Sequence, residues 1–72
     1  MKNEHMTVCH VIDRYLEWNE TFAVITRKRG AIQVLFNGTL MDWIGTSVAN
    51  KYEMEQIKSF RQKQNHIPIV EV

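Results

Sequence analysis

The chain has 72 residues, of which 44% are hydrophobic and 24% charged, and its formal net charge is +1. These values are typical of one small globular domain over residues 1–72 and exclude a disordered chain. The near-neutral charge counts against a dedicated polybasic nucleic-acid binder, because such proteins derive their affinity from neutralising many phosphates. Cys9 is the single cysteine, so no internal disulfide can form. Without a secretory signal or a membrane-length apolar run, we expect a cytoplasmic protein.

Residues 1–6 show no periodicity, and the first predicted element is an amphipathic helix over about residues 7–18. Thr7 is suited to the N-cap position. The apolar residues recur at helical spacing and fill one half of a helical wheel: Val8, Cys9, Val11, Ile12, Tyr15, Leu16 and Trp18. The β-branched residues of this segment keep a strand as the alternative interpretation.

Three antiparallel strands are predicted next, over about residues 22–27, 31–36 and 39–44. The first turn, Lys28-Arg29-Gly30, is interpreted as a three-residue loop with Gly30 in the left-handed conformation. The second turn is Asn37-Gly38, a strong hairpin signal because both residues tolerate positive φ. The lengths of the two turns fix the register, and the register decides which face each side chain occupies.

In this register, both faces of the predicted sheet carry apolar residues. The stronger face is the expected core: Phe22, Val24, Ile32, Val34, Phe36, Met41 and Trp43. The reverse face is more diluted by polar residues, and its apolar members are Ala23, Ile25, Leu35, Leu40 and Ile44. If two helices cover the first face, the second remains as an apolar strip, and such a strip is a candidate interface.

A second helix is predicted over about residues 48–64, capped by Thr46 or Ser47 and stopped before Pro68. Residues 67–72 are either irregular or a short strand, which Pro68 would confine to the edge of the sheet. The expected fold class is therefore α+β, with a three-stranded antiparallel meander flanked by an N-terminal and a C-terminal helix.

The sequence contains no catalytic constellation. His5, Cys9 and His10 are close together in the chain, but zinc would need further ligands at recognisable spacing. Cys9 falls on the apolar side of the predicted helix, where a buried thiol behaves as a small hydrophobe. We therefore expect no enzyme activity, no catalytic residues, no metal ligands and no cofactor.

Basic residues cluster at two places, and either cluster could contact phosphates. The first is Arg27-Lys28-Arg29 at the tip of the predicted hairpin, and the second is the outer face of the predicted second helix, with Lys51, Lys58 and Arg61. Charged residues are also the default at such exposed positions, where they only keep the protein soluble.

The predicted α-β-β-β-α order resembles the double-stranded-RNA-binding domain in element order and size. Domains of that family begin their second helix with a lysine-rich segment followed by small residues. The matching segment here is Thr46-Ser47-Val48-Ala49-Asn50-Lys51-Tyr52, with one lysine and a bulky tyrosine. The resemblance therefore covers the layout only, and no binding residue is carried over from the family.

The function favoured by the sequence is a small protein-binding module that acts as a regulator, adaptor or inhibitor, as accessory proteins of phages and mobile elements often do. The expected contact residues are apolar ones on the reverse face and basic ones at the hairpin tip: Ile25, Leu35, Leu40, Ile44, Arg27, Lys28 and Arg29. The alternative is nucleic-acid binding through Arg27, Lys28, Arg29, Lys51, Lys58 and Arg61. Homodimerisation would compensate for the small core, and no membrane partner is expected.

Overall fold

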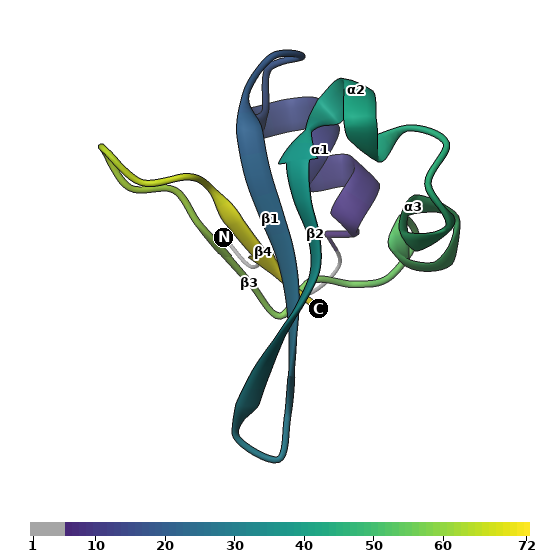
Figure 1. Cartoon of the computed structure of the whole chain (residues 1–72), viewed down its shortest axis with the longest axis vertical. Coiled ribbons are helices and arrows are strands. Elements are labelled where there is room, and N and C mark those ends of the chain that lie inside the picture. The colour runs from purple at the N-terminus through teal and green to yellow at the C-terminus, as the bar shows by residue number, and fades with distance from the viewer. Residues whose placement is uncertain (1–5) are drawn as a thin grey trace.

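One four-stranded mixed sheet, in the order β2-β1-β4-β3, forms the frame of the protein in a computed structural model that describes residues 6–72 (Figure 1). The elements in chain order are α1 (Val8–Tyr15), β1 (Thr21–Lys28), β2 (Ala31–Thr39), α2 (Leu40–Trp43), α3 (Ser47–Tyr52), β3 (Ser59–Arg61) and β4 (Ile69–Glu71). The strand β1 pairs antiparallel with β2 and parallel with β4, and β3 pairs antiparallel with β4. The α+β class is confirmed, but the predicted three-stranded meander is wrong.

The predicted first helix is confirmed as α1, and the strand alternative is wrong. The Thr7 hydroxyl accepts a hydrogen bond from the His10 backbone N–H at 3.3 Å, so Thr7 is the N-cap. The helix ends earlier than expected, because Leu16 is already extended at the C-cap. Trp18 consequently lies beyond the helix and is largely exposed, whereas Leu16 remains buried.

The first hairpin turn contains two residues, and not the three that were predicted. Arg29 and Gly30 have φ values of 52° and 81°, the positive values that a type I′ turn requires at both central positions. A β-bulge then shifts the register so that Leu35 has no partner in β1. Leu35 and Phe36 both pack against the core, while Val34 is turned to the other face of the sheet.

Asn37-Gly38 is not a turn, because β2 continues through it to Thr39 and the chain then enters α2. The Thr39 hydroxyl accepts from the Asp42 N–H at 3.3 Å, and the Asp42 carboxylate accepts from the Thr39 N–H at 3.4 Å. This capping box starts a helix where a third strand was predicted over residues 39–44. Gly38 leaves room for the Phe36 ring, since a Cβ there would lie 3.0 Å from its Cζ, closer than ordinary van der Waals contact.

The predicted helix over residues 48–64 is wrong beyond Tyr52, because the chain turns away after α3 and becomes extended. Its backbone carbonyls then cap α1: the N–H groups of Val8 and Cys9 donate to the carbonyls of Glu55 and Glu53, each at 2.9 Å. These bonds satisfy donors that the first turn of a helix leaves without partners. Ile57 is buried in the same extended segment.

The C-terminal tail forms β4, which is an interior strand and not an edge strand. The Ala23 N–H donates to the Pro68 carbonyl at 3.0 Å, and the Val72 N–H donates to the Ile25 carbonyl at 2.9 Å. Pro68 is tolerated because it precedes the first residue of the strand and lends only its carbonyl to the pairing. Val70, in the middle of β4, is completely buried.

The hydrophobic core lies between the sheet and the three helices, which all cover the same face (Figure 1). Its aromatic centre joins Phe22 to Phe36 at 5.3 Å between ring centroids and Phe36 to Trp43 at 5.0 Å. The buried members of the core come from every layer: Val8, Val11, Ile12, Leu16, Phe22, Val24, Trp43, Ala49, Ile57, Val70 and Val72. Of the residues predicted for the core face, Ile32, Val34 and Met41 are instead exposed.

We predict that Thr39→Val lowers the free energy of unfolding by about 1 kcal/mol, because valine removes the cap of α2 while keeping the side-chain shape. Chemical denaturation measures the change. Thr21→Val at the exposed start of β1 is the control and should stay within about 0.5 kcal/mol of wild type. If the chain continued as a strand over residues 39–44, with no cap at Thr39, valine would be neutral or stabilising there, and that result would contradict the capped helix.

Val70→Ala should lower the free energy of unfolding by about 2 kcal/mol, because it opens a cavity in a closed core. The matched control is Val34→Ala, the same chemical change at a side chain that is 59% exposed, where the loss should be under about 0.5 kcal/mol. Equal losses in the two variants, measured by thermal or urea denaturation, would mean that β4 is not an interior strand.

Candidate functional site: the open face of the sheet

The face of the sheet opposite the helices has no described helix lying over it (Figure 1). Side chains alternate along a strand, so the neighbours of the core residues Phe22, Val24 and Val70 project to this second face. We call it the open face, and define it by residues from all four strands: Ala23, Ile25, Arg27, Ile32, Val34, Ser59, Arg61, Ile69 and Glu71.

The centre of the open face is apolar. In the register of the sheet, Ile25 lies between Val34 on β2 and Glu71 on β4. The exposed apolar groups are on β2, where Ile32 retains 55% and Val34 retains 59% of its accessible surface. These two residues are next to each other on one face of an outer strand, so they form a continuous apolar contact surface.

Most of the predicted apolar strip is not on this face. Ile25 and Ala23 lie there as expected, but Leu35 and Leu40 pack against the core. Ile44 is 57% exposed, but it is the C-cap residue of α2 and is not part of the sheet. The sequence pattern missed Ile32 and Val34 because the two-residue turn pairs them with Arg27 and Ile25 on the open face, and the bulge beyond Val34 then returns Phe36 to the side of Val24. No local motif marks the position of that bulge.

The hairpin of β1 and β2 extends beyond the rest of the sheet as a two-stranded arm (Figure 1). The backbone pairing of β1 with β4 stops at Ile25, so the backbone of residues 26–33 pairs only within the hairpin, although the Thr26 hydroxyl donates to the Val72 carbonyl at 3.1 Å. The basic tip predicted from the sequence is there, and Lys28 and Arg29 are both exposed. Arg27 is differently placed, because its Nε lies 3.3 Å from Oε2 of Glu71 and forms an ion pair with it.

Glu71 is the only carboxylate within the four strands, and its side chain is 13% exposed. Arg27 donates to one carboxylate oxygen, and the Ser59 hydroxyl donates to the other at 3.3 Å. The hydrogen bond from Arg27 is the main cause that lowers the pKa of Glu71 below 4.5, although partial burial acts in the opposite direction. Both oxygens of the one acidic group on this face are therefore occupied.

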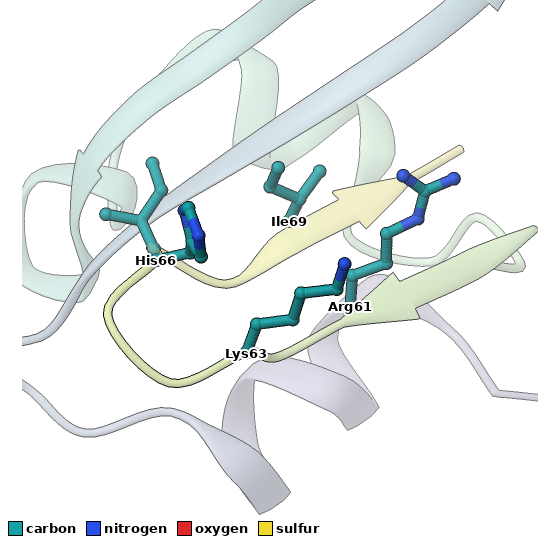
Figure 2. Close-up of a pocket in the computed structure, with 5 residues that line it drawn as sticks. Arg61, Lys63, His66 and Ile69 are labelled. Carbon is teal, nitrogen blue, oxygen red and sulfur yellow. The ribbon is translucent and has the colours of Figure 1, made fainter.

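A shallow hollow of about 180 Å³ lies at the β3–β4 end of the open face, lined by Arg61, Lys63, His66, Ile67 and Ile69 (Figure 2). Three of its five lining residues carry nitrogen donors. The basic residues that the sequence suggests for nucleic-acid binding do not form one cluster of this kind. Lys51 is on α3 with its Nζ 5.4 Å from the Tyr52 ring centroid, and Lys58 precedes β3.

Charge is divided unevenly over the protein. The arm, the open face and the hollow carry Arg27, Lys28, Arg29, Arg61 and Lys63, while Arg14 and Lys51 lie on helices. The other described carboxylates all lie on the helices or on the segments that join them: Asp13, Glu17, Glu20, Asp42, Glu53 and Glu55. Among the residues of the four strands, Glu71 is thus the single acidic side chain beside the basic ones.

Within residues 6–72, no three histidine, cysteine or acidic side chains come together in a way that could hold a metal ion. His5 lies outside the described residues. The Cys9 thiol is partly buried, 3.4 Å from the Thr7 hydroxyl and 3.9 Å from the Met54 sulfur. None of the helices in the described part of the chain has both the length and the apolar character needed to cross a membrane.

Comparison of the chain with protein-family models, with curated proteins and with solved structures finds no match. The geometry of the open face is therefore the basis for the functional argument that follows.

Replacing Arg27 with glutamine should raise the pKa of Glu71 back toward or above 4.5, because its main hydrogen-bond donor becomes neutral. A lowered folded-state pKa contributes stability above the unfolded value, and that stability is lost as pH falls through the folded value. Wild type should therefore lose more stability than Arg27→Gln on acidification from pH 6 to below 4. Carboxyl NMR titration and urea denaturation measure the two effects. Lys28→Gln is the control, and an equal response in both variants would exclude the ion pair as the cause.

Proposed function

We propose that the protein is a non-enzymatic module that binds another protein through the open face, acting as a regulator, adaptor or inhibitor of that partner. The observation that carries the proposal is the exposure of Ile32 and Val34, at 55% and 59%, on a sheet face with no described helix over it. An apolar centre with a polar, charged rim is the usual composition of a protein interface.

Each part of the surface has a separate role in the proposed interaction. Ile32 and Val34 supply the area that loses water on contact, with Ile25 beneath them as a buried floor. Lys28 and Arg29 at the end of the arm attract an acidic partner and orient it before contact. Arg27 adds rigidity, because its ion pair with Glu71 ties the base of the arm to β4.

Nucleic acid fits this surface less well than protein does. Sheets that bind single strands present aromatic rings on which bases stack. Here the aromatic side chains of the sheet lie on the core side, with Phe22 and Phe36 against Trp43 and with Phe60 against Tyr15. The basic residues proposed for phosphate contact are also split between α3, the arm and β3, which gives no continuous basic path for a strand.

The test is capture of partners from native lysate, with and without nuclease, using the wild type and two matched variants. Ile32→Ser should lose at least about tenfold of the retained partner, because burial of an isoleucine contributes about 1.5–3 kcal/mol. Ile44→Ser removes an equally exposed isoleucine, at 57% against 55%, from a site outside the open face. It should retain the partner fully.

Three outcomes of this experiment contradict the proposal. The first is loss of capture in Ile44→Ser with no loss in Ile32→Ser, and the second is loss of all captured material with nuclease. The third is failure of Ile32→Ser to keep the wild-type circular dichroism spectrum at the assay temperature, since then Ile32 would have a structural role. A partner that is a second copy of this chain would appear as a dimer in light scattering and would define the module as self-associating.

A further inference from the structure

The basic hollow is built by strand pairing and by a tight turn. Arg61 ends β3 and pairs across the sheet with Ile69, the first residue of β4. Between them the chain reverses at Asn65, which has a φ of 69°, and the His66 N–H donates to the Lys63 carbonyl at 3.2 Å. This turn brings Lys63 and His66 to the same side of the loop as Arg61 (Figure 2).

The positive groups of the hollow form no ion pair in the described part of the chain. Within residues 6–72, no carboxylate lies within 4.0 Å of Arg61 or Lys63, whereas Arg27 has such a pair with Glu71. Arg61 acts on Glu71 only through longer-range charge attraction, the smallest of the causes that lower the pKa of that carboxyl. Glu71 is the nearest acidic residue by strand position, and its two oxygens already accept hydrogen bonds from Arg27 and Ser59. The hollow is therefore lined by cationic hydrogen-bond donors, and an anion bound in it would neutralise their charge.

We infer that this hollow binds a phosphate monoester. The guanidinium of Arg61 offers a planar fork of donors that matches two phosphate oxygens, and the Lys63 ammonium adds a compact charge. The imidazole of His66 contributes a further N–H. A phosphate monoester carries close to two negative charges at neutral pH and has three oxygens to accept these bonds, so it fits the donor set better than a carboxylate. Ile67 and Ile69 would contact the carbon group that bears the phosphate.

This inference goes beyond the proposed function, because occupancy of the hollow does not require the apolar centre of the open face. The surface is open to solvent, and we expect a dissociation constant of about 1 mM for a small ligand. The site would give the protein sensitivity to a phosphorylated metabolite or to a phosphorylated side chain, and the two sources share the chemistry that the hollow recognises.

The experiment is an NMR titration of the full chain with phenyl phosphate at constant ionic strength. Amide shifts should be confined to residues 61–69, and phenyl sulfate, which has one charge fewer, should bind at least about threefold more weakly. The double variant Arg61→Gln, Lys63→Gln should weaken binding by at least about tenfold, because charge-assisted hydrogen bonds are lost. The matched control Lys28→Gln, Arg29→Gln removes the same charge from the arm and should leave the dissociation constant unchanged.

Equal weakening in the two double variants, or shifts spread over the arm and the hollow alike, would overturn the inference in favour of general electrostatic attraction. Titrations with phosphoserine and with a nucleoside 5′-monophosphate then distinguish the sources, since tighter binding of either one identifies the carbon group that Ile67 and Ile69 accept. If the wild-type protein captures its partner but does not bind phenyl phosphate, this site is refuted and the proposed function stands. If it binds phenyl phosphate in the hollow but captures no partner, the proposed function is refuted and this site stands.

Discussion

The structure depends on β1 being buried on both faces. Phe22 and Val24 face the helices, Ala23 and Ile25 face the other way, and all four are buried. A strand with apolar residues on both sides must have a neighbour along each edge, because its backbone groups would otherwise lose water without gaining partners. The chain supplies β2 on one side and brings the C-terminal β4 back to the other. This return places the two ends of the described chain in a single core.

The return of β4 also builds the functional surface. Val70 is closed in the core, while Ile69 and Glu71 on either side of it project to the open face. Glu71 then fixes Arg27 at the base of the arm, and the pairing of β4 with β3 positions the loop that forms the hollow. The strand β4 therefore stabilises the fold through its central residue, Val70. Its flanking residues, Ile69 and Glu71, position Arg27 and the loop that forms the hollow.

The bulge in β2 has the greatest consequence for surface chemistry. It places Leu35 and Phe36 together against the core, whereas the two-residue turn has already set Ile32 and Val34 on the open face. A single extra residue changes the side on which apolar groups appear, because strand side chains alternate with a period of two. The open face combines this apolar outer strand with basic residues from β3 and its loop, and Glu71 is the one acidic residue that the described strands place there.

The sequence by itself determined the local features: the Thr7 cap and α1, the strand β1, the position but not the length of the turn at Gly30, and the core roles of Phe22, Val24 and Trp43. It also located the basic tip of the hairpin, because those residues stay exposed in any register.

Only the tertiary structure decided the rest. The turn signal of Asn37-Gly38 was overridden by the capping box that follows it. Ile57 and Phe60 fit a helical spacing, but both pack against the core from extended backbone. Such choices depend on pairing between residues that are distant in sequence, as between β1 and β4, and local patterns carry no record of that pairing.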